Sequence, residues 1–446
     1  MSHTEREPTL LEEGWSLLQA SADDTAARER ALRVAIAYVE LDPFQLSAGA
    51  LLTRLAIASG RKAAAADAAA KLVDAYVRRG DLPAACAAAA LADRADGDGA
   101  TLRATIAKVF GQGSVRVADV SPSPPALPAT PDLGELEGLR GKALSDRAST
   151  ALAELTRADD PVAHGKVPAL PLFSQLAPRA LEALLAALSV RDLDTHGVAI
   201  EQGSEGREAF VVVRGSLRAE RTGASGEEPT LLAVLGPGAI FGEMALVSSA
   251  PRAASVIAQE PTTLLVVARD ALEEMAGKEP AIGRELGSYC RSRMLANLVR
   301  TSALLRAIPA AERESVMSLF EAKTFDEGQV LFEQGGEPDG LYLVASGGVR
   351  VATHDPSGGD DIVVADLGPG DVVGEISIVL RKPATATVTA TFPTVALELS
   401  RDRFHDAIRM HPAVLTELYG LATARADELR SVVAQETLDV EDVVLL

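Results

Sequence analysis

The strongest constraint on the fold is an internal duplication between residues 172 and 433. Identical short motifs recur at a constant offset of 132 residues, as the first pair shows (333 − 201). The matched pairs are Glu201-Gln202-Gly203 with Glu333-Gln334-Gly335, Gly215 with Gly347, Gly242-Glu243 with Gly374-Glu375, and Pro251 with Pro383. Several identical anchors at one spacing indicate two copies of one domain rather than chance similarity.

Both copies have the pattern of β-strands. Short apolar runs bounded by glycine, such as Ala209–Val213 and Leu341–Val344, predict about eight strands in each copy. Helices are expected before the strands, at 178–188 and 310–320, and after them, at 270–298 and 402–433. The sequence thus predicts two jelly-roll-like β-rolls flanked by helices, at 172–300 and 301–433, and an acidic C-terminal tail at 434–446.

Residues 9–110 have a helical pattern instead. Alanine is abundant, and apolar residues recur every three or four positions. Breaks such as Asp42-Pro43 divide the segment into about six helices of roughly 11–18 residues. The stretches 75–85 and 37–43 resemble the inter-helix turn and the repeat end of tetratricopeptide repeats. We therefore expect a tetratricopeptide-like helical repeat domain, with a plain helical bundle as the alternative.

Residues 111–171 are predicted to be a linker. Its proline-rich part lies at 111–132, where five prolines stand among Ser, Ala and Thr, a composition typical of an extended, semi-rigid chain. A short helix is expected at about 136–157. The whole chain is then a multidomain α+β protein.

Charge limits the classes of partner. The net charge is −20, and residues 301–446 alone contain 11 basic and 24 acidic side chains. Such a field repels nucleic acids and anionic membranes, so neither is an expected partner.

Composition also limits location and chemistry. Cys86 and Cys290 form no disulfide framework, the polar N-terminus is not a signal peptide, and no apolar run is long enough to span a membrane. We therefore expect a cytoplasmic protein. The six histidines lack metal-ligand spacing and no catalytic motif occurs, so no metal site, cofactor or enzymatic activity is expected.

The most informative motif is residues 241–256 of the first copy. A Pro-Gly turn leads to Gly242, which allows the main chain to approach a ligand closely, and the next four residues suit one helical turn whose N–H groups can face an anion. Arg252 can grip a phosphate with two hydrogen bonds, and Glu243 can accept hydrogen bonds from hydroxyls. The combination suits a phosphorylated sugar.

This motif resembles the phosphate-binding cassette of cyclic nucleotide-binding domains, as in protein kinase A regulatory subunits and the catabolite activator protein. The resemblance implies that Glu243 binds the ribose 2′-hydroxyl, that Arg252 binds the cyclic phosphate, and that main-chain amides complete the cradle. The alternative is an ion pair of Glu243 with Arg252 at a corner of the roll. The candidate ligand-binding residues are Gly242, Glu243, Met244, Ala245, Arg252, Ala253, Ala254 and Ser255.

The second copy departs from the cassette. Ala384 stands where the arginine is expected, so this site is predicted to be degenerate and to bind no cyclic nucleotide. Arg381 or Lys382 could supply the missing cation, although solvated loop charges are the simpler interpretation. The residues of the degenerate site are Gly374, Glu375, Ser377 and Thr385.

These patterns predict a non-enzymatic cytoplasmic sensor whose first roll binds cAMP and whose N-terminal helical repeat binds a protein partner. Family members that favour cGMP resemble one another in a threonine directly after the arginine, where this chain has Ala253, so cAMP is preferred to cGMP. Two alternatives stay open, namely an inhibitory regulatory subunit of a kinase and a ligand-free scaffold with vestigial folds. Residues 78–82 resemble a kinase pseudosubstrate, with an inter-helix turn as the other interpretation.

Overall fold

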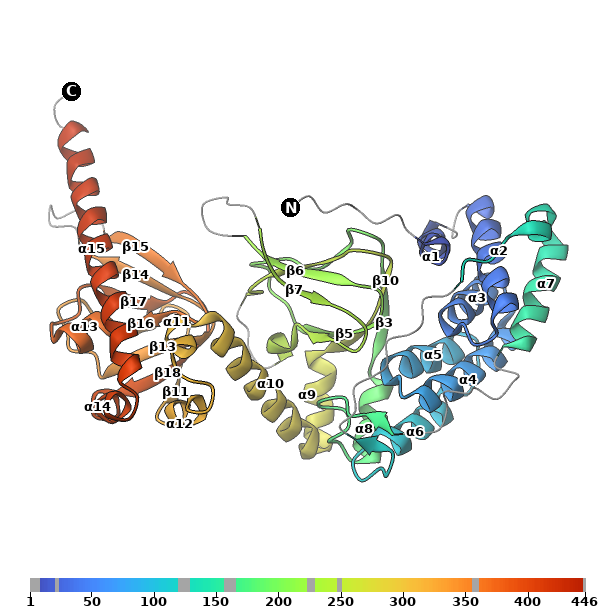
Figure 1. Ribbon diagram of the computed structural model, residues 1–446, viewed down its shortest axis with the longest axis horizontal. Helices are drawn as coiled ribbons and strands as arrows, with labels where there is room; N and C mark the ends of the chain where they lie inside the picture. The colour runs from blue at the N-terminus through green and yellow to red at the C-terminus, as the bar shows by residue number, and fades with distance from the viewer. Residues whose placement is uncertain are drawn as a thin grey trace. The chain divides into compact units, whose positions relative to one another are not determined.

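The computed structural model describes residues 9–20, 24–118, 129–155, 166–222, 229–246, 251–354 and 361–443 (Figure 1). The chain divides into two compact units, Met1–Leu246 with Arg252–Tyr289 and Val247–Pro251 with Cys290–Leu446. The first unit contains the N-terminal helices and the first roll, and the second unit contains the second roll. Parts of the predicted linker (119–128 and 156–165) and of the cassette (247–250) lie outside the described residues.

Six helices occupy the described residues between 9 and 110. They are α1 (Leu10–Ala20), α2 (Thr25–Leu41), α3 (Leu46–Ala58), α4 (Lys62–Arg79), α5 (Leu82–Arg94) and α6 (Gly99–Phe110). Three begin at an aspartate, because the side chains of Asp24, Asp81 and Asp98 accept hydrogen bonds from main-chain N–H groups of the first turn. The predicted helices are therefore present, and their tetratricopeptide-like character stays a prediction.

Part of the predicted linker packs on these helices. Strand β1 (Val117–Ala118) pairs with β2 (Val167–Pro168), and η1 (Gly134–Gly138) precedes α7 (Gly141–Glu154). Helix α7 lies against α2, α3 and α4, and its Leu144, Ala148, Ala151 and Leu152 are buried. Residues 129–155 thus contribute apolar side chains to the helical domain.

The first roll consists of α8 (Pro178–Ala186) and eight strands in two antiparallel sheets. One sheet has the order β3 (Ser189–Leu193), β10 (Thr262–Ala268), β5 (Glu208–Arg214), β8 (Ile240–Phe241). The other has the order β4 (Val198–Ile200), β9 (Ser255–Ala258), β6 (Leu217–Arg221), β7 (Thr230–Leu235). Side chains from both sheets, such as Ile200, Phe210 and Leu264, form the core between them.

The second roll repeats this topology strand for strand. One sheet has the order β11 (Glu321–Phe325), β18 (Thr394–Ser400), β13 (Gly340–Ser346), β16 (Val372–Val373). The other has the order β12 (Val330–Phe332), β17 (Thr387–Ala390), β14 (Val349–Thr353), β15 (Ile362–Leu367). Each strand begins 132 residues after its counterpart, as β11 does after β3 (321 − 189). The duplication predicted from the motifs is confirmed.

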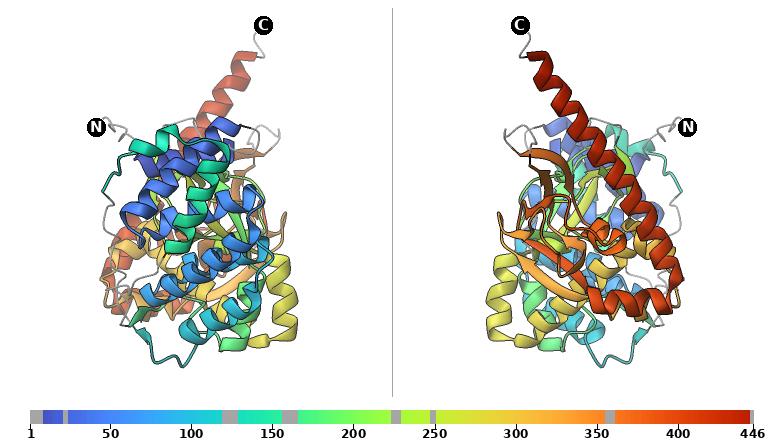
Figure 2. Two further views of the ribbon diagram at one scale, coloured as in Figure 1. Left: turned by 90° about the vertical axis from the view of Figure 1, so that its right-hand side faces the viewer. Right: turned by 90° about the vertical axis from the view of Figure 1, so that its left-hand side faces the viewer.

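The helices around the rolls differ in places from the prediction. They are α9 (Arg269–Lys278), α10 (Pro280–Thr301), α11 (Ala303–Ala307), α12 (Arg313–Met317), α14 (Arg401–Met410) and α15 (Pro412–Val443). Pro280 and Pro412 divide the two predicted long helices, because proline fits the first position of a helix and not its interior. The helix predicted at 310–320 is the five-residue α12. Helix α15 extends beyond residue 433 to Val443 (Figure 2).

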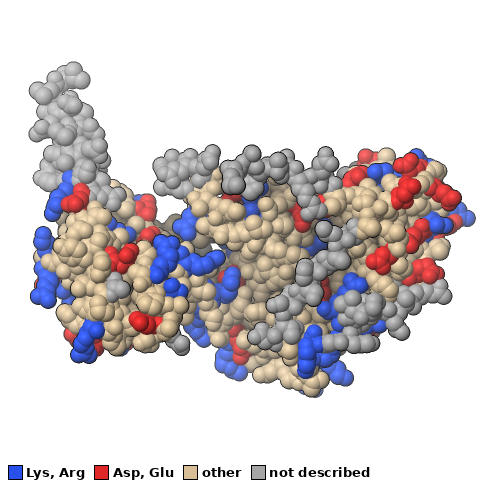
Figure 3. All heavy atoms as spheres, in the orientation of Figure 1, with Lys and Arg blue, Asp and Glu red and all other residues tan. Residues whose placement is uncertain are grey.

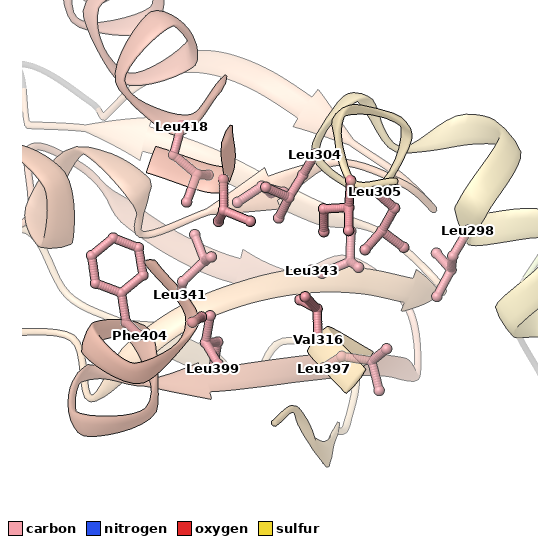
Figure 4. Packing of buried hydrophobic residues seen from close by; sticks show 14 of the residues in the cluster. Leu298, Leu304, Leu305, Val316, Leu341, Leu343, Leu397, Leu399, Phe404 and Leu418 are labelled. Carbon is pink, nitrogen blue, oxygen red and sulfur yellow. The ribbon is translucent and has the colours of Figure 1, made fainter. Parts of the chain in front are cut away.

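Helices cover one sheet of the second roll. Leu341 and Leu343 of β13 and Leu397 and Leu399 of β18 belong to one buried cluster with Leu304, Leu305, Phe404 and Leu418 of the helices (Figure 4). This packing fixes α15 on the roll, and α15 carries a residue that contacts the second site.

The helical domain packs on the first roll within the first unit. Helix α5 lies against β3, β5 and β10, and Arg54 of α3 forms an ion pair with Asp192 of β3. The guanidinium of Arg214, at the end of β5, lies 3.8 Å from the centroid of the Trp15 ring. Burial, together with the nearby charge of Arg54, lowers the pKa of Arg214 to about 9.

Candidate functional site

The candidate site of the first roll begins where β8 ends. Gly242 has φ +71, and a Cβ there would lie 2.9 Å from Nη1 of Arg252, so both the conformation and the close contact require glycine. The 3-10 helix η2 (Glu243–Leu246) follows, with the Ala245 N–H donating to the Gly242 carbonyl at 3.1 Å. The sequence motif thus forms the tight turn and the short helix that it predicted.

Arg252 is held by the main chain of two other segments. Its Nη1 donates to the Gly242 carbonyl at 3.0 Å, and its Nη2 donates to the Glu208 carbonyl at 2.7 Å. A Cβ at Gly206 would lie 2.3 Å from its Nε, so the loop before β5 closes around the guanidinium. Burial lowers the pKa of Arg252, and Glu208 and Glu243 oppose that effect. An anion bound here would restore the solvation that the half-buried cation has lost.

Glu243 is the acidic member of the site. Its side chain is buried, with 5% of the residue exposed, and it is the first residue of η2. A buried carboxylate is costly unless cations or hydrogen-bond donors compensate it. The negative charge of Glu243 opposes the lowering of the Arg252 pKa by burial.

The remaining predicted residues surround this pair in different ways. Met244 and Ala254 are half-buried, Ala245 is buried and Ala253 is exposed. The hydroxyl of Ser255, at the start of β9, accepts a hydrogen bond from the Gln202 N–H at 3.0 Å, so it serves the loop rather than the space beside Arg252.

Two contributions to this site were missed in the sequence. Gly206 makes room for the guanidinium, and Glu208 contributes its main-chain carbonyl. The signal for Gly206 was its position just after the duplicated Glu201–Gly203 motif. A main-chain carbonyl carries no side-chain signal.

The second roll keeps the backbone of the cassette. The Gly335 N–H donates to the Ala384 carbonyl at 2.8 Å, and the Ala384 N–H donates to the Gly336 carbonyl at 2.8 Å. The same two bonds join Arg252 to Gly203 and Ser204 in the first roll, at 2.8 and 2.9 Å. The two loops therefore make the same main-chain hydrogen bonds, although only the first contains the cation.

Other residues of the degenerate site form hydrogen bonds or turns within the second roll. Gly374 has φ +84 and precedes α13 (Glu375–Leu380). The Ser377 hydroxyl donates to the Lys382 carbonyl at 2.6 Å, and the Thr385 carbonyl accepts from the Thr353 hydroxyl at 3.4 Å.

The buried glutamate of the second roll has a cation from another element. Glu375 is 3% exposed, and its Oε1 lies 3.1 Å from Nη1 of Arg425 on α15, which also donates to the Val372 carbonyl. Burial raises the pKa of Glu375, and Arg425 opposes that shift. Sequence reasoning missed Arg425, because it lies 50 residues along the chain from its partner.

A single family model matches a segment of each roll. The model described as "Cyclic nucleotide-binding domain" matches residues 190–279 and 322–411. A cAMP-dependent protein kinase regulatory subunit of Yarrowia lipolytica is 29% identical over 233 residues, which are 52% of this chain and 57% of that protein. One from Dictyostelium discoideum is 31% identical over 211 residues, which are 47% of this chain and 62% of that protein. The chain spans less than two thirds of the length of these curated relatives.

A solved structure is also similar. The regulatory domain of Toxoplasma gondii PKA with cAMP is 26% identical in sequence, and the superposition has a TM-score of 0.28. The match covers 57% of this chain and 92% of that chain. The two matched segments, residues 190–279 and 322–411, lie in the two rolls, so each roll is similar to a cyclic nucleotide-binding domain. In sequence it is similar to regulatory subunits of cAMP-dependent protein kinase.

The described residues offer little sign of other site types. None of their helices is long and apolar enough to cross a membrane, and they contain no group of three His, Cys, Asp or Glu side chains placed to hold a metal ion. Basic and acidic side chains both occur on the face shown in Figure 3.

Proposed function

We propose that this protein is a non-enzymatic cytoplasmic cAMP sensor in which only the first roll binds the nucleotide. The observation that carries the proposal is the cradle of Arg252, where a half-buried guanidinium is aimed by two main-chain carbonyls beside a buried glutamate. A cyclic phosphate would pair with Arg252, and the ribose hydroxyl would donate to Glu243. In this proposal, cAMP binds without the help of a cofactor.

Calorimetry on the full chain tests this proposal. We expect one cAMP per chain, with weaker binding of cGMP, and loss of all binding in the Glu243→Ala, Arg252→Ala double variant. Two sites per chain, or tight binding left in the double variant, would assign the second roll a ligand and contradict the proposal.

The output is proposed to pass through the N-terminal helical domain, a tetratricopeptide-like module that binds a protein partner. Strand β5 supports this coupling, because its first residue, Glu208, holds Arg252 and its last residue, Arg214, stacks on Trp15. Trp15 is the single tryptophan of the chain, so its fluorescence reports this contact. We expect cAMP to change the emission of Trp15 and Arg252→Ala to abolish that change. An emission unaffected by saturating cAMP would contradict coupling through β5.

A kinase regulatory subunit is the second candidate, favoured by the similarity to the two curated regulatory subunits. The stretch that resembles a pseudosubstrate forms the turn between α4 and α5: Arg78 and Arg79 end α4, Gly80 is its left-handed C-cap and Asp81 caps α5. A kinase that copurifies with the chain and is released by cAMP would establish this alternative.

A further inference from the structure

A pocket of about 290 Å³ lies on the second roll outside the degenerate nucleotide site. It is formed by the end of α13, the loop that follows, and the start of α14. Four of its lining side chains are basic: Arg381, Lys382, Arg401 and His405. Phe404 and Glu337 also line the pocket.

The positions of these cations are fixed by the main chain. Arg381 has φ +53, a left-handed conformation that costs a non-glycine residue about 1 kcal/mol or more. Its N–H and that of Lys382 both donate to the Ser377 carbonyl. Arg401 donates to the Pro338 carbonyl at 3.0 Å and to the Ser377 hydroxyl at 3.3 Å. The loop is therefore held in a strained turn that presents two neighbouring cations.

Arg381 and Lys382 are exposed, and neither forms an ion pair with another residue in the described part of the chain. Their charges are thus available at the pocket mouth. Some other exposed arginines of this roll do pair, as Arg350 does with Asp366 at 2.8 Å. Arg381 and Lys382 are adjacent in a segment, 301–446, that contains 24 acidic and 11 basic residues.

The first roll provides an internal comparison. At the offset of 132 residues, Arg381, Lys382 and His405 correspond to Ser249, Ala250 and Glu273. The second copy therefore lacks the arginine of the cassette, with Ala384 in its place, and has basic side chains at three positions where the first copy has none. The anchoring residue is common to both copies, because Arg401 corresponds to Arg269.

We propose that this outer pocket of the second roll binds a phosphate monoester. The Arg381 guanidinium offers paired donors, Lys382 offers a compact positive charge, and the ring N–H of His405 adds a third donor. Glu337 faces the same pocket and favours a ligand that also carries a hydrogen-bond donor beside its phosphate. A phosphorylated polyol has such hydroxyls and a phosphorylated serine in a peptide has such an amide, so both sources share the chemistry.

The experiment uses the full chain saturated with cAMP, so that the first roll does not contribute. Inorganic phosphate, glycerol phosphate, a phosphoserine peptide and its unphosphorylated form are titrated, with calorimetry and the NMR signal of the His405 ring as readouts. His405→Gln identifies that signal. The pocket variant is Arg381→Ser with Lys382→Ala, which installs the residues of the first roll.

We expect phosphate to shift the His405 signal and the pocket variant to weaken phosphate binding about tenfold or more. The matched control removes two exposed arginines of the same unit, Arg409→Ala with Arg430→Ala, and should leave the affinity unchanged. If only the phosphoserine peptide shifts the signal, the ligand is a phosphorylated side chain of a protein. If glycerol phosphate shifts it as well, the pocket recognises the phosphate monoester itself. An unmoved His405 signal, or equal weakening in the control, would overturn the proposal. Thermal unfolding of every variant, compared with that of the unchanged chain, checks that the second roll is folded.

Discussion

The two rolls surround a buried glutamate with cations of different origin. In the first roll, the charge of Glu243 acts on Arg252, a cation nine residues further along the same cassette. In the second roll, the cation paired with Glu375 is Arg425, which belongs to helix α15. The first site can exchange main-chain carbonyls for a ligand anion, whereas the second is already neutralised by its own chain.

The two rolls share the main-chain conformation of the cassette loop, but only the first has the arginine that a phosphate ligand requires. The loop bonds made by Arg252 are also made by Ala384, since they involve only main-chain atoms. Pro338 occupies the position of Gly206, which has to be glycine only where a guanidinium lies against it. Loss of ligand binding therefore need not disturb the fold.

The largest expected effect tests the local cation. Arg252→Ala should weaken cyclic-nucleotide binding by about 2–5 kcal/mol, or roughly 30- to 4000-fold, because a desolvated phosphate loses its charged partner. Calorimetry with cAMP measures the change. Arg207→Ala, an exposed arginine paired with Asp270, is the control and should bind normally. An affinity within threefold of wild type would remove Arg252 from the site.

The next effect tests the space around that cation. Gly206→Ala places a methyl group on the Arg252 guanidinium, so the side chain must move and cAMP affinity should fall roughly 5- to 150-fold. Gly236→Ala is the matched control, because a Cβ there meets nothing within 4 Å. Equal affinities of the two variants would show that the close fit at Gly206 has no role in binding.

The strands and the cassette could be predicted from sequence because their signals are local or repeated. Glycines at turns and the constant offset located the strands, and Gly242, Glu243 and Arg252 lie within eleven residues of one another. Arg425 could not be predicted, since its contact depends on the path of α15 across the roll. The stacking of Arg214 on Trp15 depends in the same way on how the helical domain meets β5.

A third prediction tests the helix-borne cation. Arg425→Ala leaves the buried Glu375 without its ion pair and should lower the free energy of unfolding by about 1–3 kcal/mol. Thermal unfolding of the full chain measures this change, and cAMP binding at the first roll should be retained. Arg430→Ala removes an exposed arginine of the same helix, and a loss of stability as large as that of Arg425→Ala would contradict the role of the buried pair.

A fourth prediction transfers one residue between the rolls. The second roll has Thr385 where the first has Ala253. Ala253→Thr adds a hydroxyl beside Arg252 that can bond a guanine, so the preference for cAMP over cGMP should narrow by about 1 kcal/mol, or roughly fivefold. Parallel titrations with both nucleotides give the ratio, and Ala253→Val controls for size. An identical narrowing in the valine variant would exclude the hydroxyl as the cause.

The smallest effect concerns the protonation of the second site. Burial raises the pKa of Glu375 above its ordinary value despite Arg425, so the folded state favours the protonated carboxyl. The stability gained from that proton is present in full below the ordinary glutamate pKa and is lost as the pH rises through the pKa of Glu375 in the folded state.

Glu375→Gln is permanently neutral, and its side-chain oxygen can still accept a hydrogen bond from Arg425. The variant should therefore raise Tm slightly at neutral pH, and the gain should vanish toward about pH 4. Unfolding followed across this range, with exposed Glu333→Gln as the control, gives the difference at each pH. A Tm lowered at neutral pH would show instead that the ion pair with Arg425 outweighs the cost of burying the charge.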